Sequence, residues 1–236
     1  SKYGVIFTSA GEYLAKCAQR QIQFMDEIRY KLDCLQNEQQ GTLILGTSYS
    51  FSKSLLPDIL KKYKRLFPNV ELEMICMKSE KLAYMAGTGQ LHGAFVRGKY
   101  DVSAEQVNVD DENGYILSRE AIDIQKLPEL DQVGYDSSTY TKDLIDQWWK
   151  ENFENPPHIV MTASILDSAW TLVSQGLGYT ISFLDSEQEK ALKLWKYPIK
   201  NKDGSPVKRS TYFLYKDLEN QPDFVRAFIH MIQERI

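Results

Sequence analysis

Cysteine is scarce in this chain, with three residues among 236. Cys17, Cys34 and Cys76 are an odd number, and their spacing fits neither a disulfide framework nor a zinc site. We therefore expect reduced thiols, as in a cytoplasmic protein. Cys17 and Cys34 are expected to be packing residues on a helix. Cys76 is expected at a buried strand end, with a redox-sensing thiol as the alternative.

Long apolar runs and an excess of positive charge are also missing. No stretch of about 18 apolar residues occurs, so we expect no membrane-spanning helix. The first residues lack the basic-then-apolar pattern of a signal peptide. The 28 basic and 32 acidic residues leave a formal net charge of −4, which excludes an overall basic footprint for nucleic acid. The basic run over 61–65 is typical of a solvated helix face.

The sequence contains no recognisable catalytic motif. Neither G-x-x-x-x-G-K-[ST] nor G-x-S-x-G occurs, and no Ser/His/Asp grouping follows from the spacing. GTGQLHG (87–93) misses the dinucleotide pattern G-x-G-x-x-G by one position and precedes a predicted strand. His92, His158 and His230 stand apart, with no pair at ligand spacing. We predict that the protein is not an enzyme and holds neither a metal nor a cofactor.

A long amphipathic helix is the first feature that the sequence does contain. Thr8 or Ser9 can cap its start, and Ser9 with Glu12 forms an S-x-x-E capping box. From there to about residue 38 the apolar spacing alternates between three and four residues, which is typical of a coiled coil. The stripe consists of Leu14, Ala18, Met25, Ile28, Leu32 and Leu35, with Gln21 as its polar break.

This helix is too long to be covered by one compact domain. At 1.5 Å per residue it extends over roughly 45 Å. We therefore predict that a second copy of the chain buries the stripe in a dimer, and the sequence leaves a tetramer open. The alternative is an amphipathic helix that lies along its own domain.

After Gly41 the pattern changes to alternating strands and helices, which indicates α/β units with a parallel sheet. In the first half, strands are expected at 43–47, 70–76 and 93–98, with helices at 50–67 and 79–86. In the second half, strands are expected at 132–136, 158–162, 179–183 and 209–215, with helices at 140–152, 165–175 and 222–235. The acidic segment 107–115 predicts a turn-rich boundary. Pro57 fits its helix only within the first turn.

Two α/β units in one chain predict a ligand cleft, because open α/β sheets bind ligands beyond the carboxyl ends of their strands. Hydroxyl and cationic side chains follow the predicted strands, several at helix starts whose N–H groups attract an anion. These candidates are Thr47, Ser48, Ser50, Lys78, Ser79, Arg97, Ser137, Ser138 and Thr162. Singly, each hydroxyl is equally explained as a helix cap. Together they predict a ligand site, and Lys78 with Arg97 favours an anion.

Three stretches, in order, resemble the LysR-type transcriptional regulators. GVIFTSAGEYL (4–14) is similar to the family's V-x-L-T-x-A-G-x-x-L pattern, where the DNA-binding domain passes into a linker helix. Residues 41–74 resemble the start of the effector domain, with the spacing LLP…F…P-x-V-x-L. LVSQGLGYTIS (172–182) resembles the LV-x-x-G-L-G-x-x-x-L-P stretch.

The resemblance implies two Rossmann-like subdomains as in type II periplasmic-binding proteins, preceded by the linker helix. Residues 1–40 would be the remnant of a wing plus the dimerising helix. Residues 41–115 with 217–236 would form the first effector subdomain, and 116–216 the second. The resemblance further implies a small-molecule effector in the cleft, promoter DNA bound through a winged helix-turn-helix ahead of Ser1, and a cytoplasmic location.

The chain departs from the family pattern at two places. GQLHGAFV (89–96) has His92 and Gly93 where an acidic residue is common, and Phe183 stands where proline is common. These departures leave the predicted fold intact and the class of effector open. The rival prediction is a solute-binding protein of a transporter, which has a similar bilobed fold but would be a secreted monomer without a dimerising helix.

Overall fold

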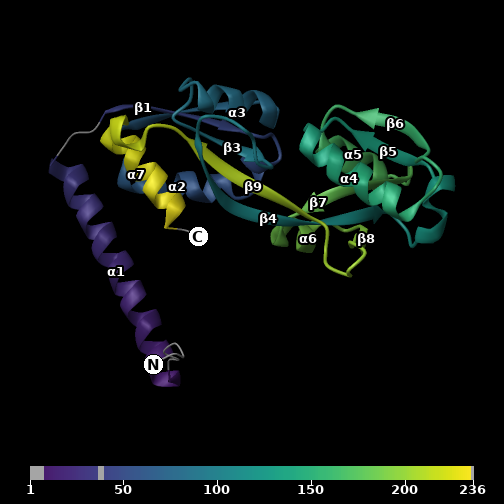
Figure 1. Ribbon diagram of the computed structural model, residues 1–236, viewed down its shortest axis with the longest axis horizontal. Coiled ribbons are helices and arrows are strands. Elements are labelled where there is room, and N and C mark those ends of the chain that lie inside the picture. Colours follow the sequence, from purple (N-terminus) through teal and green to yellow (C-terminus); the bar gives the residue numbers. More distant parts are fainter. Residues whose placement is uncertain (1–7, 37–39, 235–236) are drawn as a thin grey trace.

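The computed structural model describes residues 8–36 and 40–234. It consists of a long N-terminal helix and a body of two lobes that share one mixed sheet (Figure 1). Within the described residues, every helix is too short or too polar to cross a membrane.

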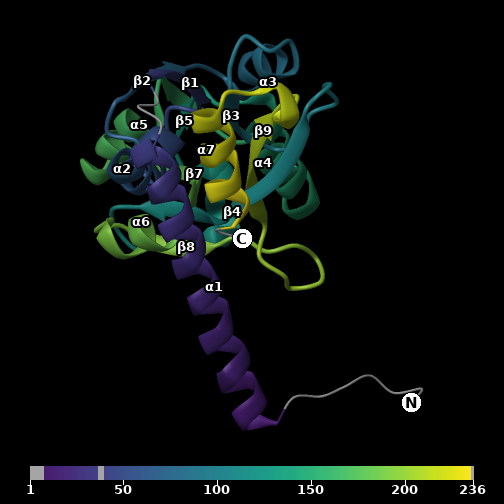
Figure 2. The ribbon, with the colours of Figure 1, turned by 90° about the vertical axis from the view of Figure 1, so that its left-hand side faces the viewer.

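Helix α1 (Ser9–Gln36) extends away from the body in both ribbon views (Figures 1 and 2). Thr8 Oγ1 accepts a hydrogen bond from the Gly11 N–H at 3.2 Å and so caps the helix start. Of the two caps that the sequence allowed, Thr8 is the one observed, and Ser9 is already helical, one residue earlier than a capping box of Ser9 and Glu12 predicted. The predicted end near residue 38 lies outside the described residues.

Lobe I contains the first three strands of the chain and the C-terminal helix. Its strands β1 (Gly41–Thr47), β2 (Val70–Cys76) and β3 (Gly93–Arg97) are parallel neighbours. Helices α2 (Leu56–Leu66) and α7 (Asp223–Gln233) pack on one face around Phe51, Phe95 and Phe228, and α3 (Ser79–Gly87) covers the other face. A short 3-10 helix η3 (Leu218–Asn220) precedes α7.

The helix predicted over 50–67 is divided in the structure. A 3-10 turn η1 (Phe51–Lys53) comes first, and α2 begins at Leu56. Pro57 therefore falls in the first turn of α2, where its missing N–H breaks no helical hydrogen bond. The prediction that Pro57 fits its helix only within the first turn is therefore confirmed.

Lobe II has cores of its own. Its strands are β5 (Gln132–Tyr135), β6 (Ile159–Ala163), β7 (Tyr179–Leu184) and β8 (Trp195–Pro198), and its helices are η2 (Ile124–Glu129), α4 (Thr139–Asn152), α5 (Leu166–Ser174) and α6 (Ser186–Ala191). Strand β5 is parallel to both β6 and β7. Trp148, Trp149 and Phe183 belong to one core and Val133 with Val173 to another.

Two strands connect the lobes. β4 (Glu105–Ser118) and β9 (Lys208–Tyr215) pair antiparallel, and the strand order is β2-β1-β3-β9-β4-β7-β5-β6 with β8 on β4. The prediction of a turn-rich boundary over 107–115 is wrong, because this segment lies inside β4. Val107 and Val109 pack on the lobe I core, which holds the acidic segment in an extended conformation. The sheet is parallel toward its two edges, while its central pairs are antiparallel.

The Gly-Leu-Gly stretch makes the turn between α5 and β7. Gly176 and Gly178 have φ angles of 83° and 120°, which L side chains rarely adopt. A Cβ on Gly178 would lie 2.2 Å from the carbonyl oxygen of Asp131. Glycine is therefore required at Gly178 by both backbone conformation and space.

Candidate ligand-binding site

A cavity of about 180 Å³ lies between the lobes, at the end of β1, β2 and β3 in lobe I and of β5 and β6 in lobe II. Seven of the nine residues predicted from the sequence line it: Ser48, Ser50, Lys78, Ser79, Arg97, Ser137 and Ser138. Their assembly follows from the chain direction, because parallel strands present their carboxyl ends at one edge.

The other two predicted residues do not line this cavity. Thr47 is buried, and its Oγ1 donates a hydrogen bond to the Ser48 carbonyl oxygen at 3.2 Å. Thr162 is exposed on β6. A ligand contact of any of the nine side chains stays a prediction.

Three helices of eight or more residues begin at the cavity. Lys78 immediately precedes α3, Ser138 precedes α4 and Ile165 precedes α5. The Ser138 Oγ accepts a hydrogen bond from the Thr141 N–H at 3.3 Å, so this serine is a helix cap, as the alternative interpretation of the hydroxyls predicted. The N-termini of these helices add positive potential to the cavity.

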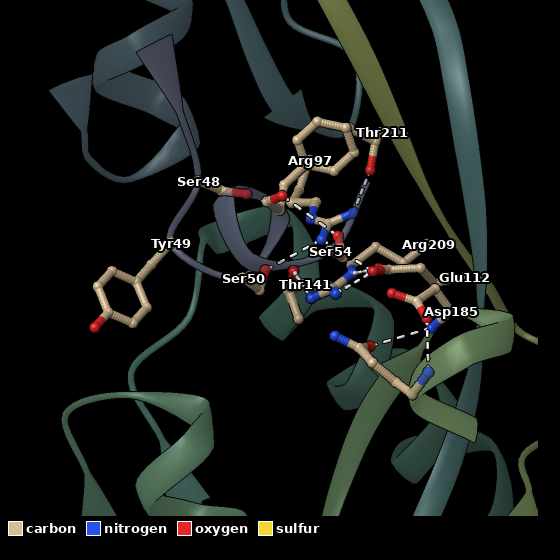
Figure 3. A network of polar contacts seen from close by, with 12 residues as sticks. Ser48, Tyr49, Ser50, Ser54, Arg97, Glu112, Thr141, Asp185, Arg209 and Thr211 are labelled. Atoms are coloured by element: carbon tan, nitrogen blue, oxygen red, sulfur yellow. Dashed lines mark hydrogen bonds and ion pairs between the residues drawn. The ribbon is translucent and has the colours of Figure 1, made fainter. Parts of the chain in front are cut away.

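A buried ion triad of Arg97, Glu112 and Arg209 lies beside the cavity, and Figure 3 shows its contacts. Glu112 of β4 accepts hydrogen bonds from Arg97 Nη2 at 2.9 Å and from Arg209 Nε at 2.8 Å. The three residues are between 1% and 3% exposed. Arg97 and Arg209 line the cavity, and the Glu112 carboxylate lies between them. A carboxylate this deeply buried is tolerable because both of its oxygens are paired.

The triad links side chains of both lobes, and its members come in part from β4 and β9, the two strands that connect the lobes. Arg97 Nη2 donates to Ser50 Oγ at 3.1 Å, and Arg97 also bonds Thr211 of β9. Arg209 Nη1 donates to Thr141 Oγ1 of α4 at 3.4 Å, and its guanidinium lies 5.0 Å from the centroid of the Phe183 ring. Burial lowers the pKa of Arg97 to about 10, which leaves the guanidinium charged at neutral pH.

Three buried polar atoms of cavity-lining residues find no hydrogen-bond partner among the described residues. They are Ser48 Oγ, Arg97 Nε and the Tyr135 hydroxyl. Burial raises the pKa of Tyr135, so its hydroxyl is a neutral donor. Each unpaired buried donor costs about 1–3 kcal/mol. A ligand that brings acceptor atoms to these donors would offset that cost.

The two lobes also touch at the rim of the cavity. Lys78 Nζ lies 2.7 Å from Asp136 Oδ1, and Lys53 Nζ lies 3.1 Å from Asp167 Oδ1. Beside them, Cys76 lines the cavity and is exposed. The expectation of a buried Cys76 is therefore wrong: β2 ends at Cys76 at the edge of the sheet, and no β-strand among the described residues covers that edge.

Among the residues of this site that the sequence did not indicate are Tyr135, Thr141, Arg209 and Glu112. Tyr135 is the second-last residue of the strand predicted at 132–136, so its position near a strand end was a usable signal. Arg209 begins its strand, but β9 runs antiparallel to β3, so the start of β9 meets the end of β3. Glu112 lay in the segment wrongly expected to be a turn.

The stripe on α1 faces solvent wherever its side chains are described. Leu14 is 69% and Met25 63% exposed, and Ala18 is exposed as well. Tyr13, Ile22 and Phe24 add further exposed apolar surface. The side chains of Ile28, Leu32, Leu35 and Cys34 lie outside the described residues. Cys17 is half-exposed, and its expected packing role stays a prediction.

A bilobed α/β body with two crossing strands and a polar cavity between its lobes defines a small-molecule binding domain. The model of the LysR substrate binding domain matches residues 36–236. The chain belongs to this family of transcriptional regulators, and the predicted fold class is confirmed. The family match favours the regulator over the transporter component that the sequence left as an alternative.

Relatives and solved structures agree with this assignment. The chain is 27% identical over 230 residues to the HTH-type transcriptional regulator YraN of Bacillus subtilis (strain 168), covering 98% of this chain and 79% of YraN. The C-terminal domain of a probable LysR family regulator from Rhodococcus sp. RHA1 superposes with a TM-score of 0.68 at 18% identity, covering 83% of this chain and all of that one. The effector-binding domain of QuiR in complex with shikimate gives a TM-score of 0.68 at 14% identity, covering 82% of this chain and 96% of QuiR's.

Proposed function

We propose that this domain senses a small anionic effector in the cavity between its lobes and acts as part of a dimer built on α1. The observation that carries the proposal is the set of unpaired buried donors, Ser48 Oγ, Arg97 Nε and the Tyr135 hydroxyl, in a wall with two buried guanidinium groups. A carboxylate satisfies such donors and is attracted by the helix starts. The neighbour QuiR, which is described with shikimate, supports a ligand of this class.

The apolar stripe on α1 supports the dimer. Leu14 and Met25 are each more than 60% exposed on a helix that extends away from the body (Figure 2). Such contiguous apolar surface marks an interaction site. A second α1 with the same heptad spacing is the occupant that fits it.

In this proposal the effector changes how the regulator binds promoter DNA. DNA binding belongs to a winged helix-turn-helix ahead of α1, as the name of the relative YraN supports, and the protein acts in the cytoplasm. The predicted subdomains, 41–115 with 217–236 and 116–216, are the parts that move, and β4 with β9 is the hinge. The effect on DNA binding is limited by the difference in effector affinity between the two arrangements.

Thermal unfolding in the presence of small carboxylic acids tests the effector site. At 100 times its dissociation constant a ligand stabilises the folded state by about 2.7 kcal/mol, which raises the midpoint by about 5–10 °C for a chain of this size. The rise should shrink in Ser48→Ala and Tyr135→Phe, which each remove one unpaired hydroxyl. Ser174→Ala, on the far end of α5, is the matched control and should keep it. A panel without any stabilising acid, or equal shifts in all variants, would contradict the proposal.

A further inference from the structure

The buried wall of the cavity has more cations than carboxylates. Arg97 and Arg209 both contribute guanidinium groups, and Glu112 between them uses both of its oxygens on this pair. Glu112 itself does not line the cavity within the described residues. One positive charge of the triad is therefore left for whatever occupies the cavity.

The charges at the rim balance one another. Lys78 pairs with Asp136, and Lys53 pairs with Asp167, each pair joining lobe I to lobe II. Among the described side chains, these two pairs and the triad contain four cations and three carboxylates. The cations are Lys53, Lys78, Arg97 and Arg209, and the carboxylates are Asp136, Asp167 and Glu112. The excess is again one positive charge.

Other carboxyl groups near the cavity do not change this number. Glu80 accepts the Thr139 N–H at the start of α4, and Asp185 accepts two N–H groups at the start of α6, so each offsets a helix dipole. Asp110, two residues before Glu112, does not line the cavity within the described residues. Neither ion pair of the triad includes Asp110.

We propose that the cavity selects effectors with a single negative charge, and that Glu112 is the residue that sets this number. The inference rests on the proposed effector site. A second negative charge would be taken out of water without a counter-charge of its own, which is strongly unfavourable. The cavity of about 180 Å³ is below the roughly 300–1,000 Å³ usual for ligand pockets. Compact monocarboxylates are therefore the class of ligand that fits.

Matched pairs of acids that differ by one carboxylate test the selection. Benzoate with phthalate, and butyrate with succinate, are suitable pairs at pH 7.5 and constant ionic strength, with dissociation constants measured by calorimetry. In the natural protein the monoanion of at least one pair should bind about tenfold or more tightly than its dianion. In Glu112→Gln the preference should fall or reverse, because the wall then has two unpaired guanidinium groups.

Further variants keep the test decisive if Glu112→Gln folds poorly. Asp136→Asn adds the same positive charge at the exposed rim, without entering the core, and should shift the preference toward dianions by about twofold to threefold, since solvent screens it. Asp203→Asn adds a charge in an exposed turn outside the cavity and should leave the preference unchanged.

The outcomes separate this inference from the proposed function. Dianions that bind the natural protein as tightly as their partners overturn the charge selection and leave the effector site standing. A preference that stays the same in Glu112→Gln overturns the role of Glu112. If that variant does not fold, a preference that stays the same in Asp136→Asn overturns the selection by charge. If neither monoanions nor dianions bind the natural protein, both proposals fail.

Discussion

Glu80 Oε1 of α3 accepts a hydrogen bond from the Thr139 N–H of α4 at 2.6 Å, across the boundary between the lobes. The Lys78–Asp136 pair is next to it and is more than half exposed on both sides. Exposed pairs contribute about 0–1 kcal/mol each, so these contacts hold the lobes together only weakly. Contacts of this strength are compatible with the movement of the lobes that we propose.

Removal of the Glu80 carboxylate should loosen the boundary without unfolding the protein. In Glu80→Ala the Thr139 amide loses its acceptor, so its hydrogen exchange, followed by NMR, should become faster. The free energy of unfolding should change by no more than about 1 kcal/mol. Glu73→Ala, on the exposed edge of β2, is the control. An unchanged exchange rate at Thr139 would show that this contact does not hold the lobes.

The ion triad should matter far more for stability than any exposed ion pair. Arg209→Met leaves Glu112 with one partner in a buried site, and we expect a loss of about 3–5 kcal/mol in urea unfolding. Arg226→Met removes the exposed partner of Asp223 and should cost less than about 1 kcal/mol. Equal losses in the two variants would contradict the view of the triad as a buried unit.

Stability should fall in mild acid because of His92. Its Nδ1 accepts the Ile44 N–H at 3.0 Å, and burial lowers its pKa below the ordinary 6.5. As the pH falls below about 6.5, the unfolded chain takes up a proton that the folded chain resists, so the free energy of unfolding declines. Above that pH the group adds no pH dependence.

His92→Asn offers a direct comparison, because the Asn Oδ1 can accept the same N–H without titrating in this range. Urea unfolding at pH 7.5 and pH 5.5 should show a smaller decline in the variant than in the natural protein. Identical declines would assign the pH dependence to other groups.

The α1 stripe should control assembly. We expect the natural chain to sediment as a dimer or a larger even assembly, and Leu14→Glu with Met25→Glu to sediment as a monomer with an unchanged circular dichroism spectrum. Lys16→Glu, placed outside the stripe, is the control. A natural chain that is monomeric at micromolar concentration would refute the predicted role of α1.

The strands and helices were predictable where the spacing of apolar residues reflects the burial of one face of the element. VELEMIC at 70–76 is the observed β2, and the helix expected at 79–86 is α3 extended by one residue. The segment 107–115 was not predictable, because Glu112 pairs with partners far away in the chain. In the sequence Glu112 stands in a stretch typical of a turn, and its partners Arg97 and Arg209 reach it only in the folded protein.

The candidate site was predictable to the extent that the strands are parallel. Ser48, Lys78 and Ser137 follow such strands and meet at the cavity. Arg209 enters the site from the start of an antiparallel strand, and strand direction cannot be read from the alternation of residues along the chain. Thr162 shows the opposite failure, because it is on a correctly predicted strand but lies on the exposed face of β6.

The Cys76 thiol can report whether the effector occupies the cavity between the lobes. Cys76 is exposed and lines the cavity. In a variant with Cys17→Ser and Cys34→Ser, the rate at which a thiol reagent labels the protein therefore measures access to the cavity. The measurement is the labelling rate of Cys76 with and without a saturating carboxylate that raises the unfolding midpoint. We expect labelling to slow about fivefold or more, since the bound site is closed to the reagent for most of the time. A rate that stays the same while the acid still stabilises the protein would place the ligand outside this cavity and refute the proposed effector site.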